Sequence, residues 1–261
     1  LVYLYATDKE GQYQYIKSAT DKGYDVLLLN GQLDIPFVGM LEQKNEKSRF
    51  VRVDSDVIDN IIRKEDAPKT ELTSLQKTIA STLFKSQIPA IDKCEFFVTY
   101  EALSPDAPSV VLTQSEYMRR MKEMSKFQPG MSFYGEMPDN YNFTLNTNHP
   151  VVIKAINAAE NALDAELKPL EADLNGVNAE IKALHDLTKD NKELDAGKKQ
   201  ELQDKEKQAE DIRNKEKNII TKYADGQNVV KQLVDVALLS NGLLKGEDLA
   251  NFLKRSVNLL K

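Results

Sequence analysis

The sequence predicts a small α/β domain with a mostly parallel sheet and crossover helices, followed by an α+β domain with a long antiparallel coiled-coil insertion and a terminal helix pair. Three observations support this fold class. Short apolar runs alternate with helical patterns over residues 1–63, apolar residues follow heptad spacing over 163–223, and two apolar helical patterns close the chain. The polar, proline-ended stretch 64–68 indicates a boundary, so we expect domains at 1–66 and 67–261.

The first domain alternates strand and helix signals. Gly23 ends the first helical pattern, and Asn30 with Gly31 closes the second strand pattern. Strands that are separated by helical crossovers imply a small, mostly parallel sheet. The strand patterns cover 1–6, 24–29 and 48–53, the helical patterns cover 9–22 and 54–63, and 36–44 is expected to form a short helix or turn.

The second domain begins with a mixture of helices and strands. Two strand candidates flank the turn at 103–108, and the stretch 127–140 is expected to be a loop because it contains Pro129, Gly130, Gly135 and Pro138. The expected helices cover 69–85 and 114–125 and resume near Pro150, and the expected strands cover 94–100, 109–112 and 141–145.

Five of the six methionines lie within twenty residues of one another. Met118, Met121 and Met124 are spaced i, i+3, i+6, so they form one stripe on the helix expected at 114–125. A methionine side chain is flexible and polarisable, so such a stripe either fills gaps in a core or forms an adaptable binding surface. The remaining two are Met131 and Met137, to which the sequence assigns no role.

Residues 163–223 are the most regular part of the chain. From Leu163 to Leu184 the apolar residues are spaced 4-3-4-3-4-3, and a weaker repeat resumes after a polar break at 190–197. The pattern predicts an antiparallel coiled-coil hairpin, whose first helix Pro169 should start or kink. Because 27 of the 61 residues are charged, the hairpin is either a partner-binding arm or a solvated insertion that pairs only with itself.

The chain closes with two apolar helical patterns. Residues 228–240 are apolar around most of the helix circumference, so this helix must be buried on more than one side. Residues 247–260 place their apolar side chains on one face. The pair is either packed on its own domain or shared with a second copy in a four-helix bundle.

Composition and motifs exclude several functional classes. The net charge of −6 gives no overall attraction for nucleic acid or for an anionic membrane, and no apolar run is long enough to span a bilayer. Cys94 is the only cysteine, and neither His149 nor His185 has a partner at metal-ligand spacing. No glycine-rich phosphate loop or nucleophile elbow is present. We therefore expect no catalytic, cofactor or metal site in this chain.

Six short motifs follow one another along the chain: KGYDVLLL with GQLD at 22–34, RFVRVD at 49–54, SEYMRRM at 115–121, LNTNHP at 145–150, ALLSNG at 237–242 and FLKRSV at 252–257. Their order and spacing resemble the 90-kDa heat-shock protein family, in its bacterial HtpG type. The resemblance implies a stress-response chaperone of the bacterial cytoplasm, of which this chain would be the C-terminal half.

The resemblance also assigns the domains. Residues 1–66 would be the α/β end of the middle domain and 67–261 the C-terminal dimerisation domain, in which 163–223 is longer than in familiar members and is interpreted as a lineage-specific insertion. The chain starts at Leu1 without an initiator methionine, so we interpret it as a fragment. ATP and Mg²⁺ would bind to an N-terminal domain absent here. The last residues of the sequence do not resemble the acidic tail of the eukaryotic members, so we expect no capture of TPR co-chaperones.

By resemblance, two activities remain for this chain, namely homodimerisation and the binding of unfolded or partly folded client proteins. The rival interpretation is a coiled-coil scaffold or adaptor whose charged arm binds a partner. The expected client-binding residues are Tyr117, Met118, Met121, Met124 and Phe127, and the expected dimerisation residues are Leu233, Val236, Ala237, Leu249, Phe252, Leu253 and Val257.

Overall fold

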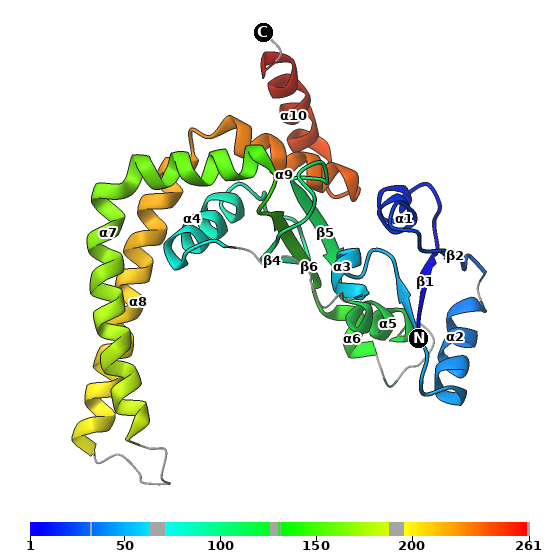
Figure 1. The fold of residues 1–261 in the computed structure, drawn as a ribbon, viewed down its shortest axis with the longest axis horizontal. Helices are drawn as coiled ribbons and strands as arrows, with labels where there is room; N and C mark the ends of the chain where they lie inside the picture. Colours follow the sequence, from blue (N-terminus) through cyan, green and yellow to red (C-terminus); the bar gives the residue numbers. More distant parts are fainter. Residues whose placement is uncertain (32, 63–70, 126–129, 131, 188–195, 260–261) are drawn as a thin grey trace. The chain divides into compact units, whose positions relative to one another are not determined.

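The computed structural model describes the chain in two compact units, which are treated separately below (Figure 1). The first unit comprises 1–70, 89–149 and 232–261, and the second comprises 71–88 and 150–231. The described residues are 1–31, 33–62, 71–125, 130, 132–187 and 196–259. The domain boundary expected at 66 and 67, Phe127, Met131 and most of the polar break at 190–197 lie outside them.

A three-stranded parallel sheet opens the first unit. It is formed by β1 (Val2–Ala6), β2 (Leu27–Leu28) and β3 (Arg49–Arg52) in the order β2-β1-β3, with Leu4 opposite Val51. The predicted parallel pairing is thus confirmed for these strands. The helices between and after them are α1 (Tyr13–Thr20), α2 (Asp34–Lys44) and α3 (Ile58–Ile61).

The first helix begins four residues later than the sequence pattern predicts, because the preceding residues form a turn. Oδ1 of Asp8 accepts hydrogen bonds from the backbone N–H groups of Glu10 and Gly11, each at 3.0 Å. Oε1 of Gln12 accepts from the N–H groups of Thr7 at 2.7 Å and Asp8 at 2.9 Å. Short polar side chains that bond to the nearby backbone favour turns over helix.

A second three-stranded sheet lies in the same unit. It consists of β4 (Cys94–Glu101), β5 (Val110–Gln114) and β6 (Asp139–Asn146) in the order β4-β6-β5, with β4 parallel and β5 antiparallel to β6. The late strand β6 therefore lies between the two earlier ones. The backbone N–H of Gln114 donates to the carbonyl of Asp54 at 3.1 Å, which ties the end of β5 to the chain beyond β3.

Two helices lie between β5 and β6, where the sequence pattern predicts only one. They are α5 (Glu116–Ser125) and α6 (Ser132–Glu136), so the loop expected over 127–140 is wrong for 132–136, and also for 139–140, where β6 has already begun. A Cβ atom at Gly135 would lie 3.1 Å from Oγ of Ser125. The glycine therefore allows α6 to approach α5 closely. In the sequence, this glycine was a signal for a loop, and its role in packing was not visible.

The second unit is a helical assembly of α4 (Ser74–Lys85), α7 (Pro150–Asp186) and α8 (Ala196–Ala224). Thr73 and Gln76 form a capping box at the start of α4. Asn178 contacts Arg213 while His185 lies near Glu206, so α7 and α8 run antiparallel, as the heptads predict.

Pro169 does not start a helix. It lies inside α7, which begins at Pro150 and is assigned without interruption to Asp186. A proline interrupts the hydrogen-bond ladder of a helix and bends it, and Figure 1 shows α7 bent along its length, in agreement with the expected kink. The helical arm is therefore longer than the heptad pattern alone indicates.

The last two helices of the described chain are α9 (Asn228–Ser240) and α10 (Gly246–Leu259), close to their predicted ranges. A polar network joins them. Arg255 forms an ion pair with the buried carboxylate of Asp235, its Nε donates to Oε1 of Gln232 at 3.0 Å, and Nε2 of Gln232 donates to Oγ of Ser256 at 2.6 Å. Within the described part of the chain, no helix combines the length and apolarity needed to cross a bilayer.

Candidate functional site

Helix α5 has two chemically opposite faces. Glu116, Arg119, Arg120 and Glu123 follow the spacing i, i+3, i+4, i+7 and share one face. The methionines and Tyr117 occupy the other side. A surface helix normally buries its apolar side. In α5 the charged face contains the buried residue, Arg119, which is only 5% exposed.

Arg119 is held by three oxygen-bearing side chains. Its Nη2 lies 2.8 Å from Oε1 of Glu116 and donates to the hydroxyl of Tyr5 at 2.6 Å, and its Nη1 donates to Oε1 of Glu123 at 2.6 Å. The Tyr5 hydroxyl in turn donates to Oε1 of Glu116 at 2.9 Å. These contacts fasten α5 to strand β1.

Arg120 fastens the same helix to α2 and β3. Its Nη1 donates to Oε2 of Glu42 at 2.6 Å, its Nη2 to the carbonyl of Phe50 at 2.7 Å, and its Nε to Oε1 of Glu116 at 2.6 Å. Glu116 therefore accepts hydrogen bonds from two guanidinium groups. Charge-assisted bonds of this kind fix geometry more strongly than neutral ones.

The protonation states follow from these contacts. Burial by itself would raise the pKa of Glu116, but the adjacent Arg119 and Arg120 outweigh it and hold that pKa below its ordinary value. Burial, reinforced by the carboxylate of Glu116, raises the pKa of Tyr5 to about 12. At neutral pH the cluster thus contains an ionised carboxylate, a neutral phenol and two cations.

With the charged face buried, the predicted client-binding residues lie on the open side of α5. Tyr117 is 61% exposed and Met124 is 39% exposed, whereas Met118 and Met121 are half-buried. The structure thus gathers four of the five predicted residues on one helix. The fifth, Phe127, lies outside the described residues.

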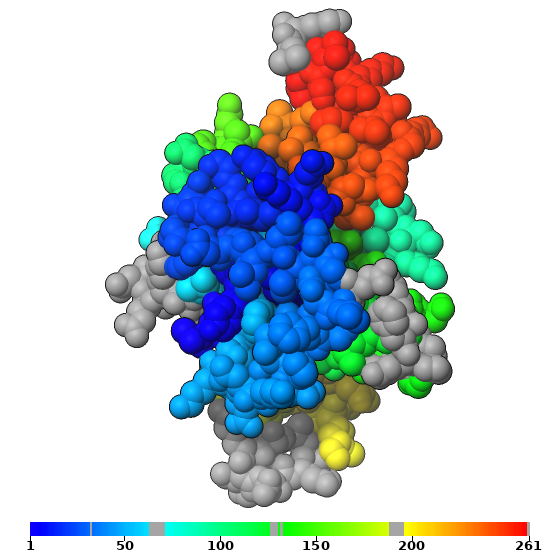
Figure 2. Space-filling model, turned by 90° about the vertical axis from the view of Figure 1, so that its right-hand side faces the viewer, coloured from blue at the N-terminus to red at the C-terminus, as the bar shows by residue number. Residues whose placement is uncertain are grey.

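The predicted dimerisation residues divide into buried, half-buried and exposed groups. Ala237 and Phe252 are buried within the protomer, so they pack the terminal helices internally. Figure 2 shows the surface of α10, in red, open on the face presented to the viewer. The exposed apolar residues of α9 and α10 are Val229, Val236, Leu239, Leu253, Val257 and Leu259, while Leu233 and Leu249 are half-buried.

A further exposed apolar set lies on and beside α2, where the sequence pattern indicated no site. Leu33 is 79% exposed, Phe37 53% and Met40, the methionine outside the cluster, 40%. Their spacing of three to four residues is that of one helix face. The segment around Pro36 was too short for its periodicity to distinguish a helix from a turn, so this face was not predicted.

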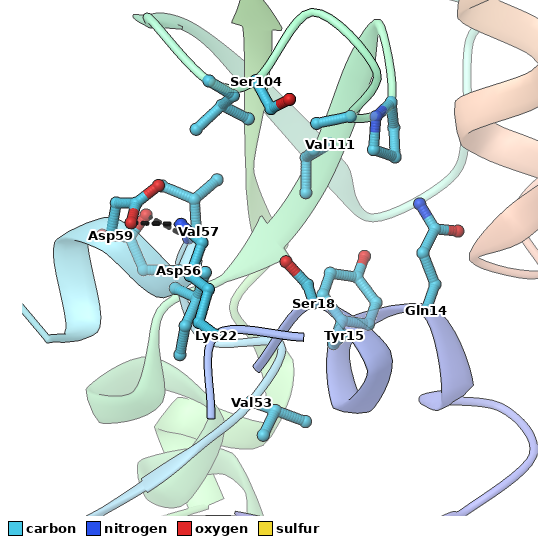
Figure 3. Close-up of a pocket in the computed structure, with 14 residues that line it drawn as sticks. Gln14, Tyr15, Ser18, Lys22, Val53, Asp56, Val57, Asp59, Ser104 and Val111 are labelled. Atoms are coloured by element: carbon cyan, nitrogen blue, oxygen red, sulfur yellow. Dashed lines mark hydrogen bonds and ion pairs between the residues drawn. The ribbon is translucent and has the colours of Figure 1, made fainter. Parts of the chain in front are cut away.

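Figure 3 shows a pocket formed by α1, the segment from β3 to α3, and the loop before β5. It encloses about 90 Å³. Val53, Val57 and Val111 line it, and the ion pair between Lys22 and Asp59 lies at its side. Among the described residues no group of three or more histidine, cysteine or acidic side chains is arranged to hold a metal ion.

Comparison with known proteins gives a consistent result along the whole chain. No family model matches it. The chaperone protein HtpG of Bacteroides thetaiotaomicron is 49% identical over 262 residues, and the corresponding proteins of Bacteroides fragilis and Porphyromonas gingivalis are 47% and 43% identical. Each alignment covers the whole of this chain and 38% of the relative. The span 163–223 therefore has a counterpart in these relatives.

Proposed function

This chain belongs to the HtpG chaperone family and spans 38% of the length of the relatives it matches. We propose that it is the C-terminal part of such a chaperone. In this proposal residues 1–66 are the end of the middle domain and 67–261 the dimerisation domain. The chain forms homodimers and holds non-native client proteins.

The observation that carries the client-binding proposal is that α5 is anchored through its charged face, whereas a surface helix is usually anchored through its apolar face. Its charged face is anchored to β1, α2 and β3, and its apolar face is only partly covered, with Met118 and Met121 half-buried. Tyr117 and Met124 remain on the surface although burial of a side chain such as methionine stabilises a protein by about 1.5–3 kcal/mol. A partner that covers this face gains part of that free energy.

Methionine suits a variable partner. Its unbranched thioether side chain adapts to partners of different shape, whereas β-branched residues present a fixed outline. Met118, Met121 and Met124 therefore provide a deformable surface, and Tyr117 adds a rigid aromatic contact. This combination fits exposed apolar segments of unfolded chains better than one defined ligand.

Dimerisation is supported by the terminal helices. Ala237 and Phe252 pack internally, while Leu253 and Val257 present a second apolar face on α10. Two such helix pairs related by a two-fold axis would cover that face in a four-helix bundle. The ion pair between Arg255 and Asp235 holds α9 and α10 in one relative register within each protomer.

The remaining parts of the proposal concern the whole protein. We assign ATP hydrolysis, with Mg²⁺, to an N-terminal domain of the parent chaperone and no catalytic step to this chain, and we place the parent in the bacterial cytoplasm. The coiled-coil adaptor stays as the rival, because α7 and α8 present a largely charged surface. Retention of all client and partner binding after shortening of the hairpin would reject that rival.

Client binding is tested with a permanently unfolded protein such as reduced, carboxymethylated α-lactalbumin. We expect the double variant Tyr117→Ser, Met124→Ser of the 261-residue chain to bind it about tenfold more weakly in fluorescence anisotropy. Tyr13→Ser is the matched control, because Tyr13 is 62% exposed but lies on α1. Equal affinity of the double variant and the unchanged chain would contradict the proposal.

A further inference from the structure

A polar cavity lies at the carboxyl ends of two parallel strands in the first unit. It encloses about 410 Å³ and is bordered by the turn after β1, the end of β3, the strands β5 and β6, and the turn after α9. The side chains that matter here are Asp8, Arg52, Asp54, Gln114, Tyr141 and Asn241. The carboxyl edge of a parallel sheet is the usual place for a ligand in open α/β folds.

Two hydrogen-bond donors of the cavity are not fully used by the protein. Nε and Nη2 of Arg52 donate to the carboxylate of Asp54 at 2.5 and 2.8 Å, but Nη1 has no acceptor among the described residues. The hydroxyl of Tyr141 likewise makes no hydrogen bond within the described part of the chain, although its ring stacks on Phe96. Both groups suit an acceptor such as a carboxylate.

The charges of Arg52 and Asp54 both act on the Tyr141 hydroxyl, which therefore lies near this ion pair. Burial raises the pKa of Tyr141 to about 12, and the carboxylates of Asp139 and Asp54 contribute further. Arg52 opposes the shift. The hydroxyl thus stays a neutral donor at physiological pH, within electrostatic reach of the Arg52 and Asp54 pair.

The cavity also offers acceptors with negative charge. Oδ1 of Asp8 accepts two backbone N–H groups, whereas its Oδ2 accepts no hydrogen bond from the described residues. Nε2 of Gln114 donates to Asp139 at 2.9 Å, which leaves its carbonyl oxygen as an acceptor. Two carboxylates against one guanidinium give the ionisable lining a net charge of −1, which disfavours a phosphate or another polyanion.

We propose that this cavity binds a small zwitterion of the free α-amino-acid class. The carboxylate of the ligand accepts from Nη1 of Arg52 and from the Tyr141 hydroxyl, and its ammonium group faces the carboxylates of Asp8 and Asp54. The two charges of the ligand match the open donors, Nη1 of Arg52 and the Tyr141 hydroxyl, and the open acceptor Oδ2 of Asp8. A simple anion or a simple amine matches only one of these two kinds of group.

The position of the cavity gives such a ligand a structural consequence. The hydroxyl of Tyr15, in the cavity wall, lies 2.9 Å from Oδ1 of Asn241 in the turn after α9. A ligand in the cavity therefore contacts segments of the first unit that are far apart in sequence, and it stabilises their arrangement through binding to the folded state.

The test uses the 261-residue chain and each of the twenty L-amino acids, with isothermal calorimetry for affinity and the thermal midpoint as a second readout. Potassium acetate, ethylammonium chloride and potassium phosphate serve as single-charge and polyanion probes. We expect at least one amino acid to bind and to raise the midpoint, and each simple ion to bind more weakly.

Variants then locate the site. Tyr141→Phe removes one hydroxyl and keeps the stacked ring, and Asp8→Asn removes a charge while Oδ1 still accepts the turn hydrogen bonds; each should weaken amino-acid binding about tenfold. Tyr13→Phe and Asp25→Asn, outside the cavity, should leave it unchanged. The proposal is overturned if no amino acid binds below about 10 mM, if acetate or phosphate binds as tightly, or if both cavity variants retain full affinity.

Discussion

The hydroxyl of Tyr5 accepts a hydrogen bond from Nη2 of Arg119 at 2.6 Å, across 114 residues of sequence. The same hydroxyl donates to Glu116, so a phenol on β1 lies between a buried cation and a carboxylate of α5. This connection determines which side of α5 faces solvent. The exposure of Tyr117 and Met124 is thus a consequence of ionic contacts on the opposite face.

Replacement of Arg119 should therefore be costly. Arg119→Met leaves the carboxylate of Glu116 with one cation fewer in a partly buried site, and we expect the free energy of unfolding to fall by about 3–5 kcal/mol in urea titration. Lys207→Met is the matched control, because Lys207 is an exposed cation on α8 and its replacement should change stability by less than about 0.5 kcal/mol. Similar effects of the two substitutions would show that the cluster does not anchor α5.

The lowered pKa of Glu116 predicts a defined pH dependence. A carboxyl group whose pKa is lower in the folded state stabilises the fold above its unfolded pKa, near 4.3, and that contribution is lost as pH falls through the folded value. The stability difference between the unchanged chain and Glu116→Gln should therefore shrink as pH is lowered from about 5 to about 3. Glu10→Gln, at an exposed position, should show no such trend. A difference that stays constant over this range would contradict the assignment.

The pairing of β1 with β2 and β3 and the antiparallel hairpin could be predicted from sequence, because period-two and heptad patterns are local. The anchoring of α5 could not. Glu116, Arg119 and Arg120 look like an ordinary solvated face, and only the approach of Tyr5 and Glu42, far away in sequence, makes that face the buried one. Long-range contacts of this kind leave no periodic signal.

Three other features differ from what the sequence pattern indicated. The start of α7 at Pro150 agrees with the helix expected to resume there, but the sequence pattern did not show that this helix continues unbroken into the heptad span. Gly135 was interpreted as a loop residue, yet it permits the close contact of α6 with Ser125. The polar cavity at Asp8 and Arg52 was not predicted, because its lining comes from five separate segments.

Dimerisation through α10 predicts a monomeric variant. Leu253 and Val257 are 56% and 58% exposed, so a charge at each position is tolerated by the protomer but not by an apolar interface. We expect Leu253→Asp, Val257→Asp to halve the molar mass measured by light scattering and to retain the helical circular dichroism. Leu187→Asp, at an exposed apolar position beyond α7, is the control. A dimeric double variant, or an unchanged chain that is already monomeric, would reject this interface.

A buried carboxylate in the hairpin provides a last prediction. Glu216 is 3% exposed between Ile212 and Ile220 on α8, and burial, together with the charge of Glu171, raises its pKa while Arg213 opposes the shift. A carboxyl group with a raised folded pKa loses stabilisation as pH rises from about 4.3 through the folded value, because the folded state then binds more protons than the unfolded state. Glu216→Leu should therefore stabilise the chain by about 1–2 kcal/mol at pH 7 and by less at pH 4.

Glu210→Leu, on the exposed side of α8, is the control for this prediction and should give no pH-dependent gain in thermal unfolding. If Glu216→Leu destabilises the chain at pH 7, the carboxylate has a favourable partner in the seam and this interpretation is wrong.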